Sequence, residues 1–207
     1  MNKIGLLLMF SAVFSMATSA QVHAKKGKYA FLKGEKTLNL EYDYSNMTVG
    51  KKKTEKEYVA RKVADHNKKE AGKGDKWKEN WLNARSKRYE PKFETLINKS
   101  MIKAGIKASQ GSGAKYTLVV KTTYTEPGYN IGISKMPARV DFEMVFIETA
   151  SKKEVASYVI PNVPGSQMMG FDFDVGSRVA ECYAKGGKMI GLIFIKELNR
   201  KYIFHSI

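Results

Sequence analysis

The strongest constraint on the fold is a set of three segments in which apolar and polar residues alternate. They are residues 116–125, 139–149 and 154–160, and the short turn 150–153 joins the last two. Alternation with a period of two is typical of strands that are buried on one face only. The sequence therefore predicts an antiparallel arrangement with one apolar face, which other elements must cover.

Helical patterns surround these strands. Each predicted helix has apolar residues three or four positions apart, and three of the four have a capping residue or a proline near the start. The predicted ranges are 54–69, from 76 onward, 91–104 and from 174 onward. One more alternating strand, residues 36–44, precedes them. The order predicts an α+β two-layer sandwich: a mostly antiparallel sheet of about four strands, covered on one face by helices.

The amino-terminal residues match a secretory signal. Lys3 supplies a positive charge, an apolar run follows to about Met16, and small residues precede Ala24. The apolar run is shorter than the ~20 residues that span a bilayer. We expect cleavage after Ala24, with Ala20 as the other candidate. No cysteine lies near this site, so we expect an exported protein, periplasmic or secreted, without a lipid anchor.

The rest of the chain is long enough for one domain. With residues 1–24 as the signal peptide, residues 25–207 suit a single α+β domain with a full-sized core. We predict a basic helical insertion near residues 71–90. Cys182 is the only cysteine, which excludes an internal disulfide. Its position in an apolar helical segment favours burial over a reactive thiol.

Positive charge is concentrated in one segment. The whole chain has a formal net charge of +16. Within residues 51–115, 19 lysines and arginines stand against 8 acidic residues. Such a field attracts anionic partners, among them lipid headgroups, lipopolysaccharide, acidic polysaccharide, nucleic acid and acidic proteins. A solvated surface that only keeps the protein soluble is an equally good interpretation of the sequence.

Two sets of residues are candidates for binding. The first surrounds Trp77 and Trp81, since interleaved basic and aromatic groups can bind bases or a membrane interface. The helical spacing of the two tryptophans also fits packing against the sheet. The second is the loop 125–133, where a Pro-Gly turn precedes exposed groups, although an ordinary hairpin connection explains it as well. The candidate binding residues are Lys73, Lys76, Lys78, Lys87, Arg88, Tyr129 and Asn130.

The last helical segment contains fragments of two ligand-binding motifs. Asp172 could begin a calcium loop, but the twelfth position is Tyr183 instead of the required Glu. Asp174 is instead predicted to be the N-cap of the helix. A Gly-Gly-Lys run resembles a phosphate loop, but Met189 stands where Ser or Thr is needed. The small residues recur at helical spacing, which predicts close packing of this helix on the sheet: Ala180, Ala184, Gly187 and Gly191.

The order of elements resembles a group of small envelope domains. The resemblance lies in a helix with Phe93 and Leu96, then Gly105, the strand 114–120 and the hairpin 148–151. The family members are the TolB amino-terminal domain, the periplasmic domain of curli-secretion-channel proteins, and uncharacterised exported proteins of Bacteroides-type bacteria. The resemblance extends over about residues 36–198, and the basic insertion 71–90 departs from it. It implies no catalytic residues.

These observations favour a non-enzymatic exported envelope protein. It would bind a protein partner or an anionic envelope component, such as a lipid headgroup, lipopolysaccharide or polysaccharide, and needs no cofactor or metal. One alternative is a hydrolase or redox protein that uses Cys182 or a carboxylate pair, with Glu126, Asp141 and Glu143 as candidates. The other is a polyanion or nucleic-acid binder that uses the basic segment 51–115, although its export and the lack of binding motifs count against nucleic acid. Catalysis usually needs a histidine, and only His66 and His205 remain after cleavage.

Overall fold

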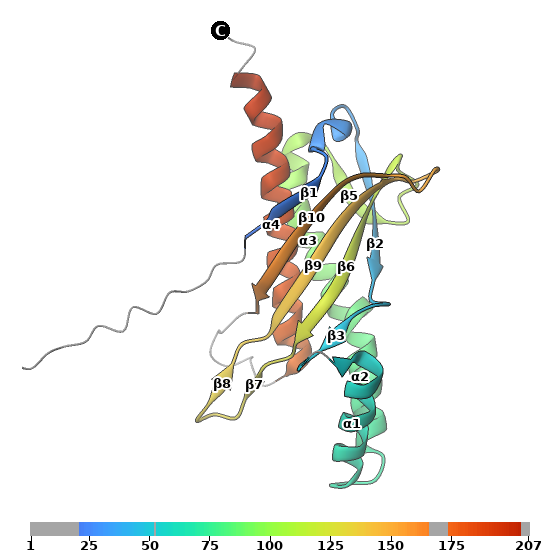
Figure 1. Cartoon of the computed structure of the whole chain (residues 1–207), viewed down its shortest axis with the longest axis vertical. Helices are drawn as coiled ribbons and strands as arrows, with labels where there is room; N and C mark the ends of the chain where they lie inside the picture. The colour runs from blue at the N-terminus through green and yellow to red at the C-terminus, as the bar shows by residue number, and fades with distance from the viewer. Residues whose placement is uncertain (1–20, 52, 166–173, 204–207) are drawn as a thin grey trace, which may run out of the picture.

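The computed structural model of the chain describes residues 21–51, 53–165 and 174–203. Most of the predicted signal peptide, together with Asp172 and His205, lies outside these residues. The described chain forms a curved sheet, with two long helices on one face and a helical hairpin at one end (Figure 1).

The elements follow the predicted order with several additions. The strands are β1 (His23–Lys26), β2 (Thr37–Asp43), β3 (Thr48–Val49), β4 (Lys53–Thr54), β5 (Lys107–Gln110), β6 (Tyr116–Glu126), β7 (Tyr129–Asn130), β8 (Lys135–Met136), β9 (Arg139–Glu148) and β10 (Glu154–Pro164). The helices are α1 (Glu55–Asn67), α2 (Lys73–Ala84), α3 (Glu90–Met101) and α4 (Val175–Ile203). Short helical turns are η1 (Tyr29–Leu32), the π-helical η2 (Arg85–Tyr89) and η3 (Ile102–Ala104).

The α+β class is confirmed, but the main sheet has more strands than predicted and includes parallel as well as antiparallel pairs. The main sheet has eight strands in the order β1-β10-β9-β6-β2-β5, with β3 and β4 attached beside β6. β6, β9 and β10 pair antiparallel, as expected. β2 pairs parallel with both β5 and β6, so the sheet is mixed. A parallel neighbour is possible because α1, α2 and α3 form the long crossover that parallel strands require.

The first strand bears on the predicted cleavage site. β1 pairs antiparallel with β10 at the edge of the sheet, and Val22 packs against the core. Cleavage after Ala24 would divide β1, whereas cleavage after Ala20 would leave the whole strand on the mature chain. Cleavage, and the choice between the two sites, stays a prediction.

The core lies between the sheet and the pair α3 and α4. The central strands point alternate residues inward, among them Leu118, Phe142 and Tyr158, each at most 1% exposed. Phe93 of α3 and Phe194 of α4 meet them from the helical side and are equally buried. The opposite face of the sheet carries no helix among the described residues (Figure 1). This single-sided covering was the predicted arrangement.

The small residues of α4 serve a different contact from the predicted one. A Cβ atom added to Gly187 would lie 2.4 Å from the carbonyl oxygen of Phe93, and one added to Gly191 would lie 3.0 Å from the Cβ of Ser100. Both neighbours belong to α3, so the close approach is between the two helices, and the prediction of a close fit to the sheet was wrong at these positions. Small residues are needed there because two helix backbones nearly touch.

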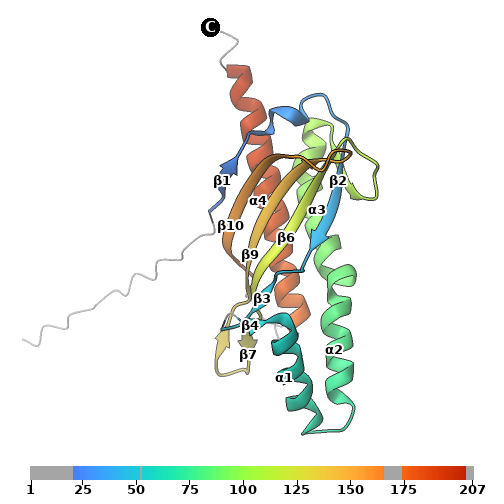
Figure 2. The same cartoon turned by 45° about the vertical axis from the view of Figure 1, so that its right-hand side comes forward.

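The second and third predicted helices are joined without a break. α2, η2 and α3 follow one another directly, and the amide of Glu90 donates to the carbonyl of Arg85 five residues earlier, which defines a π-helical turn. Pro91 comes next; it has no N–H, and its ring would crowd the carbonyl four residues back in a regular α-helix. The predicted insertion 71–90 is thus the lower part of a long helical run (Figure 2). Among the described residues, no helix is long and apolar enough to cross a membrane.

Candidate functional site

One acidic side chain links the two helices of the hairpin formed by α1 and α2. Thr54 and Glu57 form the predicted capping box at the start of α1. Next to them, Glu55 accepts a hydrogen bond from Trp81 Nε1 at 2.7 Å and pairs with Arg85. The side chain of Glu55 therefore ties the first turn of α1 to the end of α2 and to η2.

Aromatic rings fill the space between these helices. Trp77 stacks between His66 and Trp81, with ring centroids 5.7 and 5.6 Å away, and Tyr58 packs on Trp81 at 5.3 Å. The tryptophans were expected to pack on the sheet, but they pack mainly on α1. Trp81 is only 5% exposed and Trp77 is half-buried in this stack, so the indoles serve mainly for packing between the helices and are poorly placed to stack on a nucleic-acid base.

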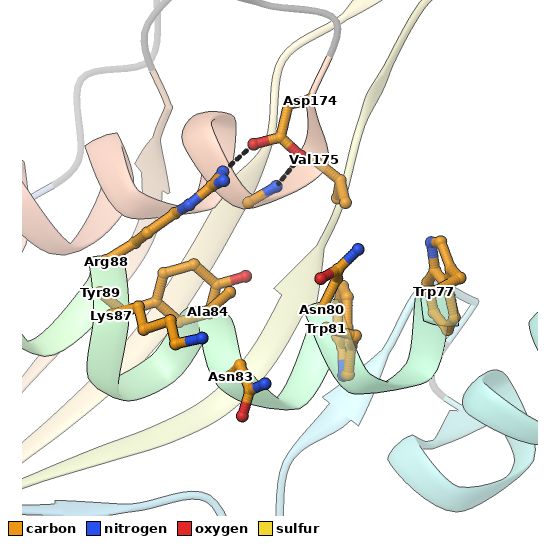
Figure 3. Close-up of a pocket in the computed structure, with 11 residues that line it drawn as sticks. Trp77, Asn80, Trp81, Asn83, Ala84, Lys87, Arg88, Tyr89, Asp174 and Val175 are labelled. Atoms are coloured by element: carbon orange, nitrogen blue, oxygen red, sulfur yellow. Dashed lines mark hydrogen bonds and ion pairs between the residues drawn. The ribbon is translucent and has the colours of Figure 1, made fainter. Parts of the chain in front are cut away.

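A pocket of about 220 Å³ lies where α2 and η2 meet the start of α4 (Figure 3). Its polar lining includes the amides of Asn80 and Asn83, the cationic groups of Lys87 and Arg88, and the carboxylate of Asp174. Lys87 has no ion pair among the described residues. The pocket is smaller than the ~300–1,000 Å³ of sites that enclose a whole small molecule, so it suits one charged group of a larger ligand.

Arg88 fixes the opposite wall of this pocket. It pairs with Asp174 and lies 3.3 Å from the hydroxyl of Ser177. Asp174 also accepts from the amides of Gly176 and Ser177, which confirms its predicted role as the N-cap of α4. The amino end of α4, with its partial positive charge, therefore adds to the cationic character of the pocket.

Tyr89 contributes a buried hydroxyl without a hydrogen-bond partner in the part of the chain that the structure describes. The side chain is 5% exposed and lines the pocket, and in Figure 3 its oxygen points away from Arg88 toward the side where Asn80 lies. Burial raises the pKa of Tyr89, so the hydroxyl keeps its proton and can act as a donor. Buried polar groups are nearly always paired, so this hydroxyl needs a partner from a ligand or from water.

The other basic candidates do not converge on the pocket. Lys73 pairs with Glu70 at 3.0 Å near the tip of the helical hairpin, and Lys76 and Lys78 are exposed on α2. Within residues 55–84, eight lysines and arginines are offset by six acidic residues. Most of the excess charge of segment 51–115 therefore lies outside residues 55–84: in residues 51–53, in η2 and in residues 103–115, which follow α3.

Tyr129 and Asn130 belong to a separate surface. They form β7, which pairs with β8 in a small two-stranded hairpin outside the main sheet. Arg178, one turn after Asp174 on α4, donates from Nε to the carbonyl oxygen of Pro127 at 3.2 Å. The first turns of α4 thus contact both predicted sets of binding residues, which do not touch each other.

The groups suggested for catalysis have structural environments. Cys182 is fully buried and its thiol lies 3.7 Å from the carbonyl of Arg178, and burial raises its pKa well above the ordinary value. Such a thiol is a poor nucleophile. The carboxylates have partners as well: Asp141 accepts from the amide of Asn162, Glu143 pairs with Lys25, and Glu126 accepts from the amide of Gly128. Among the described residues, no three side chains form a cluster that could hold a metal ion.

Comparison with known proteins gives only loose similarities. No family model and no curated protein matches the sequence. A PelC dodecamer from Paraburkholderia phytofirmans is 12% identical with a TM-score of 0.39, covering 84% of this chain and 97% of its own. Protein XCC0632 from Xanthomonas campestris, with the family model DUF330, is 9% identical with a TM-score of 0.36, covering 91% and 98%. A neuraminyllactose-binding hemagglutinin homolog from Helicobacter pylori is 11% identical with a TM-score of 0.33, covering 84% and 88%.

All of these TM-scores are below 0.5, so we transfer neither a function nor site residues from these structures. The resemblance to TolB-like and curli-channel domains stays a prediction.

Several residues of the site could not be selected from the sequence. Asn80 and Asn83 are one turn apart on α2, but a pair of amides at this spacing is common on helix surfaces. Arg178 matters because it binds the carbonyl oxygen of Pro127, and Tyr89 because it lines a pocket that also includes residues of α4. Neither relation can be seen from the sequence around these residues. The usable signals were the basic residues Lys87 and Arg88 and the N-cap pattern at Asp174, which marked the end of α4 that the site uses.

Proposed function

We propose that this chain is an exported, non-enzymatic envelope protein that binds an anionic envelope component at the amino end of α4. The observation that carries the proposal is the pocket between α2, η2 and α4, which combines Lys87, Arg88 and the buried hydroxyl of Tyr89. A cation, amides and a protonated hydroxyl are all hydrogen-bond donors, and together they favour a carboxylate, phosphate or sulfate group.

The surrounding features support an anion over the alternatives. The tryptophans are engaged in packing between α1 and α2, which counts against nucleic acid. The buried Cys182 and the paired carboxylates count against the hydrolase and redox hypotheses. Export enters the proposal through the amino-terminal pattern of the sequence, and the chain as a whole is strongly basic.

The test compares two charge reversals of equal size. Lys87 is changed to Glu in one variant, because it lines the pocket and has no ion pair among the described residues. Arg88 is left unchanged, since it supports the cap of α4. In the control variant one exposed lysine of η3, Lys103, is changed to Glu.

Retention is measured on immobilised lipopolysaccharide and on an immobilised polyuronate at rising salt. The wild type should be retained at low salt and released as salt rises, because exposed charges are screened beyond ~10 Å at 0.1 M. The first variant should lose retention, while the control variant should keep most of it. Equal behaviour of the two variants, or no retention of the wild type, would contradict the proposal and leave the charge as a means of solubility.

A further inference from the structure

The β7–β8 hairpin concentrates exposed apolar side chains in one small place. Tyr129 is 42% exposed, Ile131 66%, Ile133 97% and Met136 36%. These four are among only seven large hydrophobic residues that are exposed in the described parts of the chain. Single exposed apolar residues are normal on a soluble protein, but a contiguous group usually marks a surface that binds something.

The hairpin is mounted firmly on the body of the protein. Arg178, which is 5% exposed, donates to the carbonyl oxygens of Pro127 and Gly128 at 3.2 and 3.3 Å. Gly128 has φ of +62°, and a Cβ atom there would lie 2.3 Å from the carbonyl oxygen of Met136. A buried arginine and an obligatory glycine thus fix the base, so the exposed tip is a built feature of the fold.

The tip is prepared to leave water at low cost. The amide of Ile131 donates to the carbonyl oxygen of Ser134 at 3.0 Å, and the amide of Gly132 donates to Asn130 Oδ1 at 3.0 Å. The hydroxyls of Tyr129 and Ser134 lie 3.2 Å apart. Because these polar groups are already paired, moving the tip into an apolar medium does not strand them, which is the main cost of such a transfer.

Cations surround the base of the hairpin. Lys51 is exposed in the β3–β4 turn and Lys53 is exposed on β4. In the same turn the amide of Gly50 donates to the carbonyl of Thr125, three residues before Gly128. Lys135 is exposed on β8. Figure 2 shows β3 and β4 beside the hairpin at the same end of the molecule. Apolar side chains at the tip and cations around the base match the two layers of an anionic lipid surface.

We propose that the β7–β8 hairpin docks on an anionic lipid bilayer. Ile131 and Ile133 enter the boundary between headgroups and acyl chains, and Tyr129 and Lys135 lie at the level of the headgroups. A lipid surface is favoured over a protein partner because a stable protein interface needs ~800 Å² on each side, whereas this tip is eight residues long and convex. The inference rests on the proposed function only in that the partner is anionic.

The experiment uses the exported protein with vesicles of phosphatidylcholine alone, and of equal parts phosphatidylcholine and phosphatidylglycerol. Co-sedimentation is measured for the wild type, for Ile131→Ser/Ile133→Ser, and for Ile102→Ser. Ile102 is a matched control because it is 63% exposed but lies in η3, directly after α3 and outside the β7–β8 hairpin. The wild type should bind the anionic vesicles at least tenfold more tightly than the neutral ones, since each nearby lysine contributes about fivefold.

The double variant should bind the anionic vesicles about a hundredfold more weakly, because each isoleucine side chain that leaves water is worth about tenfold. Ile102→Ser should bind as the wild type does. A second readout uses Ser134→Cys with an environment-sensitive fluorophore, which labels only this position because Cys182 is buried. Its emission should shift to the blue when anionic vesicles are added.

Three results would overturn the inference: equal binding by the double variant and the wild type, no shift of the fluorophore, or no binding to either vesicle. Retention on lipopolysaccharide or polyuronate with no vesicle binding would overturn the lipid inference alone and leave the proposed function standing. Loss of both would overturn both. Capture of a soluble protein through Ile131 and Ile133 without vesicle binding would replace the lipid by a protein partner.

Discussion

The sheet with α3 and α4 and the hairpin of α1 and α2 are built in different ways. The first region encloses a large continuous core, with several aromatic side chains that are fully buried and two helix backbones in near contact at Gly187. The second has a small cluster of five buried residues: Met47, Val49, Tyr58, Val59 and Trp81. Its cohesion depends on one stack of aromatic rings and on the shared carboxylate of Glu55.

This difference indicates a division of labour. A region with few buried contacts opens at lower free energy than the core, and binding elements are commonly found in such regions. The helical hairpin holds one wall of the pocket, and the large core fixes the other wall through α4. We therefore expect a substitution in the helical hairpin to destabilise that hairpin alone. A substitution between α3 and α4 should lower the free energy of unfolding of the whole chain.

Trp81→Ala should produce the largest loss, about 3 kcal/mol, since the side chain is 5% exposed and fills the centre of the small cluster. The loss should be local. Hydrogen exchange should show faster exchange for the amides of α1 and α2, while the amides of β6 and β9 keep their protection. If both regions lost protection together, the chain would be one cooperative unit and the comparison would fail.

Gly187→Leu should cost about 1–3 kcal/mol by overpacking, because the first added carbon already meets a backbone oxygen of α3. Here the whole chain should be affected, with a lower midpoint of denaturant unfolding by both far-UV and tryptophan signals. Leu192→Ala is a suitable control, since this neighbouring side chain is 51% exposed and its change should have little effect. An unchanged midpoint for Gly187→Leu would mean that α3 and α4 are not in close contact.

Thr54→Ala should have the smallest effect, about 1 kcal/mol, because it removes the N-cap of α1. Hydrogen bonds from the hydroxyl and amide of Thr54 lower the pKa of Glu57. The stabilisation from this ionised carboxylate is present above the ordinary pKa of glutamate and disappears as the pH falls through the lowered value. The difference between the variant and the wild type, measured by hydrogen exchange in α1, should therefore shrink in acid; a constant difference would exclude the ionised capping box.

The sequence predicted the elements whose pattern is long enough to repeat. β6, β9 and β10 have 10 or 11 residues each, so alternation shows which face is buried. β3, β4 and β5 have 2 to 4 residues, too few for a period to be recognised. The parallel pairing of β2 could not be predicted either, because it depends on where the crossover through α1, α2 and α3 returns the chain.

The candidate site was predictable only in part for a similar reason. Exposed lysines and arginines on a helix are visible in a sequence, and Lys87 and Arg88 were among them. The pocket, however, needs η2 and the start of α4, which meet through Arg88 and Asp174, 86 residues apart in the chain. The pattern of residues in one helix does not show that its side chains will contact the N-cap of another helix far away in the sequence.

The most direct test of the central claim is a map of the ligand contact on the wild-type protein. Hydrogen exchange is measured with and without a soluble polyuronate at low salt. We predict slower exchange in α2, in η2 and in the first turn of α4. Exchange should not change in η3 and β5, which carry the exposed Lys103 and Lys107 but lie outside the pocket. Protection at β5 and η3, or no protection at any site, would contradict an anion-binding site at the amino end of α4.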